Sequence, residues 1–185
     1  MRNILIIGAG RSATSLIKYL LDKSEKEDLF ITIGDLSIES AQKFSNGHPN
    51  GKGIRLDVFD APQRSQAIKF SDLVISMLPA RFHIEVAKDC ILYKKHLVTA
   101  SYVSDEMQAL DEDAKANGLV FMNEIGVDPG IDHMSAMQVI DRIRDAGGII
   151  LMFESFTGGL IAPESDNNLW HYKFTWNPRN VVLAG

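Results

Sequence analysis

Short apolar runs alternate with amphipathic segments along most of the chain. The apolar runs are rich in Val and Ile and are apolar on both faces, which predicts strands that are covered on both sides. The amphipathic segments repeat apolar residues at helical spacing. This alternation predicts an α/β fold with a doubly wound parallel sheet and right-handed crossovers. The predicted strands cover residues 4–8, 29–35, 54–58, 73–78, 96–101 and 119–124, and the predicted helices cover residues 12–23, 82–93, 104–117 and 131–145.

The character of the chain changes after Pro129. The last predicted helix leads through two glycines into an expected long strand at residues 149–156, which is followed by a loop rich in polar residues. Earlier in the chain, residues 46–53 combine Asn, Gly and Pro and predict a surface loop. We expect a dinucleotide-binding domain over residues 1–125 and the incomplete beginning of an α+β substrate or catalytic domain over residues 126–185. The apolar ending "VVLAG" is interpreted as a cut from a longer protein.

The first predicted strand ends in a glycine-rich turn, Gly-Ala-Gly-Arg-Ser-Ala. This is the G-x-G-x-x-A form of the dinucleotide fingerprint of Rossmann-type folds. Gly8 permits the tight turn, Gly10 lets the backbone approach a pyrophosphate, and Ala13 is small enough for close helix–strand packing. The alternative is a tight turn that binds no ligand. The residues predicted to contact the cofactor here are Gly8, Gly10, Arg11, Ser12 and Ala13.

Asp35 ends the second predicted strand, at about the 20-residue spacing expected of a carboxylate that binds the adenosine ribose. A carboxylate at that position repels the additional phosphate of NADP, and the surrounding segment "GDLSIES" supplies no Arg or Lys to bind it. We therefore predict NAD as the cofactor, with NADP as the second choice. The alternative is that Asp35 only caps the following helix.

Other predicted strands also end in polar or small residues. Because the carboxyl ends of parallel strands meet at one edge of the sheet, and ligands bind in the crevice there, these residues are expected to surround one site. The segment that begins with Asp57 is expected to flank the adenine. The residues expected near this edge are Gly8, Asp35, Asp57, Ser76, Ser101 and Asp128.

Composition narrows the range of partners. The chain has 185 residues, of which 45% are hydrophobic and 23% charged, an ordinary globular composition. The formal net charge of −5 argues against nucleic acid as a partner. The single cysteine, Cys90, leaves no internal disulfide, and no histidine pair has metal-ligand spacing, so no metal is predicted. With no signal peptide and no apolar run of the ~20 residues that a membrane span needs, we expect a cytoplasmic protein that does not enter membranes.

Four segments together resemble the saccharopine dehydrogenase family, and most closely its glutamate-forming branch, the saccharopine reductases. The resemblance covers essentially the whole chain, in order. The blocks D-P-G-I-D-H and G-G-L-x-A-P-E-S-D-N-N are far more specific than the glycine turn. The four segments are "SMLPARFH" (76–83), "TASYVS" (99–104), "NEIGVDPGIDHM" (123–134) and "FTGGLIAPESDNNLWHYKFTWNPRN" (156–180).

The resemblance implies a nicotinamide-dependent oxidoreductase of lysine metabolism. Such an enzyme oxidises the secondary amine of saccharopine to an imine, whose hydrolysis gives glutamate and aminoadipate semialdehyde. Family members are much longer than this chain, and an arginine in their remaining part holds a substrate carboxylate. We therefore expect a cofactor-binding fragment that is inactive by itself.

The resemblance also implies roles for particular positions. Ser101, Tyr102 and Asp128 match positions that contact the substrate, and we expect Tyr102 and Asp128 to be catalytic. Asp128 would take a proton from the amine or orient the water that attacks the imine. Further positions match cofactor contacts, and these are Ala9 to Ala13, Asp35, Asp57, Val58, Val127, Pro129 and Thr175.

The turn "IGVDPG" ends the sixth predicted strand at the same edge. Gly126 and Gly130 would let the backbone pass close to nicotinamide and substrate, while Pro129 fixes the turn and the next helix points its positive end at the site. Asp128 has the alternative role of a turn residue bonding its own backbone, and Tyr102 that of a core aromatic.

Two other functions remain open at this stage. A carboxynorspermidine dehydrogenase of polyamine synthesis shares the chemistry, and the sequence does not separate it from a saccharopine enzyme. A non-catalytic NAD(H)-sensing module would use the same fold, although a sensor has no need of the two specific blocks. A small-molecule substrate is expected for either enzyme, and a homodimer is compatible with both.

Overall fold

The computed structural model describes residues 1–156 and 161–173. The chain divides into two compact units, Met1–Met137 and Gln138–Gly185. The division falls inside helix α7 (Ile131–Asp145), and the predicted domain boundary near residue 125 stays a prediction. The first unit contains the sheet and carries most of the predicted site residues.

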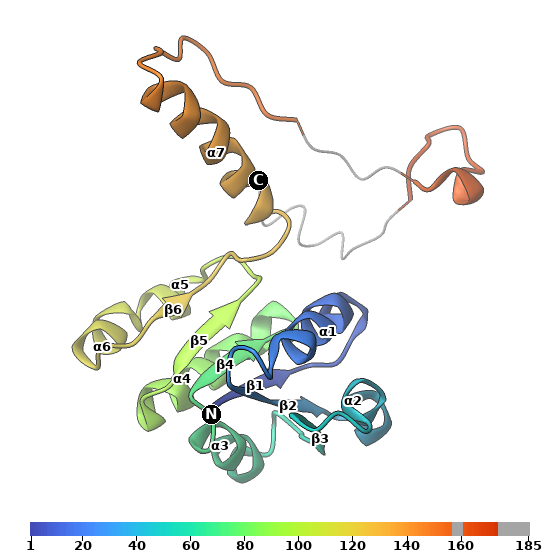
Figure 1. Cartoon of the computed structure of the whole chain (residues 1–185), viewed down its shortest axis with the longest axis vertical. Coiled ribbons are helices and arrows are strands. Elements are labelled where there is room, and N and C mark those ends of the chain that lie inside the picture. The colour runs from blue at the N-terminus through green and yellow to red at the C-terminus, as the bar shows by residue number, and fades with distance from the viewer. Residues whose placement is uncertain (157–160, 174–185) are drawn as a thin grey trace. The chain divides into compact units, whose positions relative to one another are not determined.

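The first unit is built on one six-stranded parallel sheet with the order β3-β2-β1-β4-β5-β6 (Figure 1). The order reverses next to β1, which is the arrangement of a Rossmann-type doubly wound fold. The predicted fold class is therefore confirmed. The strands are β1 (Arg2–Ile7), β2 (Leu29–Asp35), β3 (Gly51–Arg55), β4 (Leu73–Ser76), β5 (His96–Thr99) and β6 (Phe121–Met122).

Helices connect successive strands, and several begin at a side chain that caps them. Ser37, Asp60 and Ser104 each accept a hydrogen bond from a backbone N–H of the first turn, which satisfies a donor that the helix itself leaves unpaired. The α-helices are α1 (Thr14–Lys23), α2 (Ile38–Ser45), α3 (Ala61–Lys69), α4 (His83–Tyr93), α5 (Asp105–Gln108), α6 (Asp111–Ala116) and α7, and the 3-10 helices are η1 (Arg11–Ala13), η2 (Ala80–Phe82) and η3 (Pro163–Ser165).

The core lies on both faces of the sheet, which explains why the strands are apolar throughout. In β1, Ile4 and Ile6 pack on one face with α1 and α2, whereas Leu5 and Ile7 pack on the other with α3 and α4. The helices on the two faces can be followed in Figure 1. Double coverage leaves the edge at the carboxyl ends of the strands as the place where side chains reach solvent.

The third strand begins earlier than predicted. Residues 51–53 were expected in a surface loop, but they pair with β2 as the start of β3. The glycines that suggested a loop serve packing instead: a Cβ on Gly53 would lie 2.7 Å from the backbone of Ala41 in α2. Close helix–strand packing therefore requires glycine inside this strand.

The predicted strand at residues 149–156 is wrong, because this segment has no regular secondary structure. A strand needs a hydrogen-bonded neighbour, and none of the described strands pairs with it. Most of its apolar side chains are accordingly exposed, Leu151 to 93%. Within the described part of the chain, no helix combines the length and the apolar content that crossing a membrane requires.

Candidate functional site at the carboxyl edge of the sheet

The glycine turn joins β1 to α1 in a conformation that its sequence allows. Gly8 has φ +104°, and a Cβ there would lie 3.0 Å from the carbonyl oxygen of Met77, so the fold itself requires glycine at this position. Gly10 differs. It is exposed, its φ of −71° suits any residue, and an added Cβ would meet no heavy atom within 4 Å. The open space above Gly10 is what close approach of a pyrophosphate needs.

Asp35 ties the end of β2 to the glycine turn. Its Oδ2 accepts a hydrogen bond from the Ala9 N–H at 2.7 Å, and its Oδ1 accepts one from the Ser37 N–H at 2.9 Å. The alternative in which Asp35 caps the next helix is wrong, because Ser37 is the N-cap of α2 and its Oγ accepts from the Ser40 N–H at 3.1 Å. The carboxylate thus links the glycine turn to the residue that caps α2.

A small hollow of about 190 Å³ opens beside Asp35. Asp57 and Val58 line it, together with the aromatic residues Phe59 and Phe82, which the sequence analysis did not name individually. The rings of Phe59 and Phe82 meet edge to face with their centroids 4.9 Å apart, and Phe59 is 71% exposed. An exposed aromatic ring at the mouth of a hollow is suited to contact a flat base. Its signal in the sequence is Phe59 within "DVFD", directly after the third strand.

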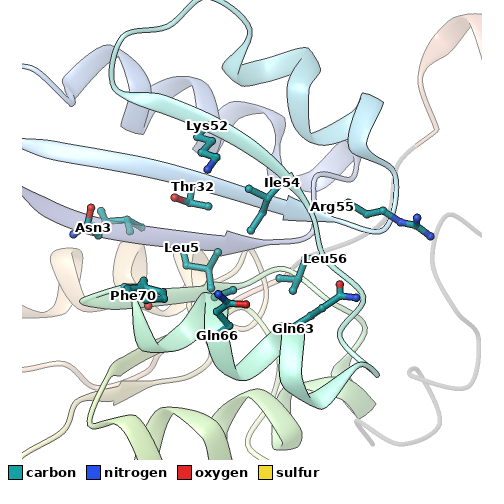
Figure 2. Close-up of a pocket in the computed structure, with 13 residues that line it drawn as sticks. Asn3, Leu5, Thr32, Lys52, Ile54, Arg55, Leu56, Gln63, Gln66 and Phe70 are labelled. Atoms are coloured by element: carbon teal, nitrogen blue, oxygen red, sulfur yellow. The ribbon is translucent and has the colours of Figure 1, made fainter.

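A larger hollow, of about 420 Å³, lies elsewhere. Figure 2 shows side chains of β1, β2, β3 and α3 pointing into it, among them Thr32, Lys52 and Gln66. None of the predicted site residues lines it. Its position along the sheet face, between the strands and α3, separates it from the glycine turn.

Three polar side chains are linked where β4 and β5 end. Ser76 Oγ lies 2.8 Å from His83 Nδ1, and His83 Nε2 lies 2.8 Å from Ser101 Oγ. Ser76 and His83 are buried, and Ser101 is half-buried. Desolvation by burial lowers the pKa of His83 to about 4. The sequence analysis expected Ser76 and Ser101 at this edge, and His83 ends the segment "SMLPARFH" that contributes to the family resemblance.

Tyr102 and Asp128 lie close together, although they are far apart in sequence. The pKa of Tyr102 is raised by desolvation and then by the nearby charges of Asp128, Asp132 and Glu124. Tyr102 is 51% exposed, so it is not a core aromatic. His133 pairs with Asp132, with 2.7 Å between Nδ1 and Oδ1, and that hydrogen bond raises the pKa of His133.

The turn after β6 is closed by its own backbone. The Gly126 N–H donates to the Pro129 carbonyl at 2.9 Å, and the Ile131 N–H donates to the Gly126 carbonyl at 3.0 Å. Gly130 has φ +145°, and a Cβ there would collide with the backbone of Gly126. The turn holds Asp128 at the start of α7 and leaves Val127 exposed.

The remaining predicted site residues are Arg11, Ser12, Ala13 and Thr175. Thr175 lies outside the described residues. Arg11 and Ser12 are exposed and Ala13 is buried in η1, as the glycine-turn interpretation requires. Among residues 1–156 and 161–173, no group of three His, Cys, Asp or Glu side chains is arranged to hold a metal ion.

Comparison with known families covers both halves of the chain. The model of the saccharopine dehydrogenase NADP binding domain matches residues 4–122, and that of the saccharopine dehydrogenase C-terminal domain matches residues 126–185. The chain belongs to the saccharopine dehydrogenase family. The glycine turn, Asp35 and the hollow beside it fall within the part that matches the family's NADP-binding domain, whereas Asp128 falls within the second match.

Individual members of the family are similar to the chain over nearly its whole length. The chain is 44% identical to a saccharopine dehydrogenase (NADP(+), L-glutamate-forming) of Schizosaccharomyces pombe, over 100% of the chain and 40% of that protein. It is 39% identical to an alpha-aminoadipic semialdehyde synthase of Arabidopsis thaliana, over 98% of the chain and 19% of that protein. The solved apo saccharopine dehydrogenase (L-Glu forming) from Saccharomyces cerevisiae matches with a TM-score of 0.83 and 38% identity, covering 100% of the chain and 40% of that structure. This family member thus spans less than half the length of these relatives.

Proposed function

We propose that this chain is the cofactor-binding part of an oxidoreductase that acts on the CH–NH group of saccharopine, in lysine metabolism. The overall reaction converts saccharopine, NAD(P)+ and water into glutamate, aminoadipate semialdehyde, NAD(P)H and a proton. The observation that carries the proposal is the meeting of the glycine turn, Asp35 and the Tyr102–Asp128 pair at the carboxyl edge of one parallel sheet. Family membership and the names of the relatives support the choice of substrate.

The proposed cofactor contacts follow the strand order. The backbone from Gly10 to Ala13 faces the pyrophosphate, Asp35 the adenosine ribose, and Asp57, Val58 and Phe59 the adenine. Val127 and Pro129 would border the nicotinamide, and a bound cofactor would supply the acceptor for the hydride of the substrate carbon.

The proposed catalytic residues act on the substrate nitrogen and on water. Asp128 takes the proton of the secondary amine as the carbon–nitrogen bond is oxidised, and it then orients the water that attacks the imine. The phenol of Tyr102 lies near Asp128 and keeps its proton, because desolvation and the nearby carboxylates raise its pKa above the ordinary value. Ser101 and Tyr102 contact the substrate from the end of β5.

Three observations bear on which nicotinamide cofactor is used. The matching domain is named for NADP binding, and the yeast and fungal relatives carry NADP(+) in their names, which supports NADP. The structure also brings Arg55 beside Asp35, as its register partner on β3, so a cation that the local sequence lacked is supplied by the neighbouring strand. The carboxylate of Asp35, by contrast, favours NAD. We propose NADP as the cofactor, and NAD is the alternative that the Asp35 carboxylate favours.

A fluorescence titration of the chain with NADPH and with NADH tests both points. We expect saturable binding, and in Asp35→Asn we expect the affinity for NADPH to rise relative to that for NADH, because a negative charge next to the additional phosphate is removed. Asp22→Asn removes an exposed carboxylate from α1 and serves as the matched control. Absence of binding by both cofactors would refute the cofactor-binding proposal, and an unchanged NADPH-to-NADH ratio in Asp35→Asn would refute the role of Asp35.

The substrate, catalytic turnover, the cellular location and the oligomeric state stay proposals. A carboxynorspermidine-type substrate is tested by assaying the full-length protein with each amine. The sensor alternative predicts cofactor binding without turnover in that protein. A cytoplasmic location and a homodimer remain predictions.

A further inference from the structure

The hydrogen bonds that link Ser76, His83 and Ser101 indicate which of their atoms carry protons. The two contacts of the His83 ring are both to hydroxyl groups, each at 2.8 Å. Ser76 is completely buried and His83 is 3% exposed, so water does not complete the hydrogen bonding of either. The three residues come from three different elements, β4, α4 and the loop after β5.

The imidazole is neutral in this setting. Burial lowers the pKa of His83 to about 4, and no carboxylate is bonded to the ring within the described part of the chain. A neutral imidazole has one nitrogen that donates a hydrogen bond and one that accepts. The question is which nitrogen faces Ser76.

The hydroxyl proton of Ser76 decides this. Among the described residues, His83 Nδ1 is the one hydrogen-bond partner of Ser76 Oγ. If Nδ1 carried the proton, the Ser76 O–H would be buried without an acceptor, which costs about 1–3 kcal/mol. Ser76 therefore donates to Nδ1, and the ring proton sits on Nε2.

The same logic then fixes the direction of the next hydrogen bond. The Nε2–H of His83 donates to Ser101 Oγ, so the hydroxyl proton of Ser101 is not used within this chain of bonds. Ser101 is half-buried, and no other side-chain contact of its hydroxyl occurs among the described residues. Its proton is available to a ligand at the carboxyl edge.

We propose that His83 is a positioning residue that holds Ser101 as a hydrogen-bond donor toward an oxygen acceptor of the ligand. The ligand chemistry is a carboxylate or carbonyl oxygen, which either the amino-acid substrate or the carboxamide of the cofactor supplies. Only this choice of ligand rests on the proposed function; the direction of the hydrogen bonds does not.

The tautomer is measurable by NMR on the 185-residue chain labelled with ¹⁵N in histidine, at pH 7. We expect the His83 signals to report a neutral ring protonated at Nε2, with the assignment made by their loss in His83→Gln. Ser76→Ala should convert this single tautomer into a mixture, because the donor to Nδ1 is removed. The control is Ser71→Ala, since Ser71 is also buried but donates to the Ile68 carbonyl. An Nδ1-protonated ring, an imidazolium, or an unchanged tautomer in Ser76→Ala would overturn the proposal.

Ligand binding supplies the second readout. The affinity for NADPH, and that for saccharopine added to the NADPH-bound full-length protein, is compared between the unaltered protein, Ser101→Ala and Ser101→Thr. Loss of one hydrogen bond weakens binding roughly 2- to 12-fold in Ser101→Ala, while Ser101→Thr retains the donor. The ligand that is affected identifies the source of the oxygen. If Ser101→Ala bound each ligand as tightly as the unaltered protein does, Ser101 would be refuted as a donor. If the unaltered protein bound neither ligand, the proposed function would be refuted, and the tautomer result would decide the role of His83.

Discussion

Gly10→Ala separates cofactor binding from folding more cleanly than any other single change in the glycine turn. Gly10 is exposed with φ −71° and ψ −179°, a conformation open to alanine, and an added Cβ meets no heavy atom within 4 Å. Replacing glycine where the conformation is compatible stabilises a protein by about 0.4–1 kcal/mol, because the unfolded chain loses freedom. The free energy of unfolding is therefore expected to stay the same or rise slightly.

Cofactor binding should respond in the opposite direction. The methyl group would occupy the space through which a pyrophosphate approaches the backbone. A misfit of one methyl group in a well-packed contact costs about 1–3 kcal/mol, which corresponds to roughly a 5- to 150-fold loss of affinity for NADPH. Gly8→Ala makes the contrast, because its Cβ would press on Met77 and its φ is positive, so that variant should lose stability as well.

The assay combines urea denaturation with fluorescence titration of NADPH on the same protein samples. Lys26→Ala, an exposed position in the turn before β2, controls for nonspecific effects. A Gly10→Ala protein that is as stable as the unaltered chain and binds NADPH equally well would refute the assignment of this turn to the pyrophosphate. A Gly10→Ala protein that unfolds more easily would show that the turn packs more tightly than the structure indicates.

Three further predictions concern groups buried in the first unit. Asp89→Asn removes the nearer counter-charge of Arg64, whose Nε lies 2.8 Å from Asp89 Oδ2, while half-exposed Glu85 remains 3.9 Å from the guanidinium. We expect a loss of about 3 kcal/mol in urea denaturation, the lower end of the range for a broken buried pair; a loss below 1 kcal/mol would argue against a buried pair. Because burial lowers the pKa of His83 from 6.5 to about 4, the unfolded state binds an additional proton between these values. Stability should therefore fall by about 3 kcal/mol as the pH falls from 6.5 to 4, and His83→Gln should lack this component; equal pH slopes in the two proteins would contradict it. Burial raises the pKa of the Cys90 thiol to about 12, so a thiol reagent should label the chain only after denaturation, and rapid labelling of the native protein would contradict the packing of α4.

Much of the fold could be predicted because the sheet is covered on both faces. A strand that is covered on both faces must be apolar on both faces, so runs such as "ILII" in β1 mark the strands. The order of strands and helices along the chain follows from these runs. Helix α3 was missed, since its sequence "APQRSQAIK" is largely polar and buries only Arg64 and Ile68. The strand expected at residues 149–156 was wrong because apolar content alone does not supply a pairing partner.

The candidate site was predicted unevenly for a similar reason. The glycine turn and Asp35 are close in the fold at positions set by one strand–helix–strand unit, so their spacing carries the signal. Arg55 and Phe59 lie next to residues of other elements, Asp35 on β2 and Phe82 in η2, so their part in the site depends on the fold. The hydrogen bonds of His83 to Ser76 and Ser101 likewise form only in the folded chain. The preference between NADP and NAD depends on the charges of both Arg55 and Asp35. These two residues are on neighbouring strands, so the segment around Asp35 alone does not predict the preference.

Chemical-shift mapping of the ¹⁵N-labelled chain during addition of NADPH tests the central claim most directly. The account predicts that backbone signals from Gly8 to Ala13, at Asp35 and at Phe59 move together and saturate, while signals from the hollow of Figure 2, such as Thr32 and Gln66, stay in place. Shifts concentrated in that hollow, or no saturable shifts at the carboxyl edge, would contradict the claim that this edge of the sheet binds a nicotinamide dinucleotide.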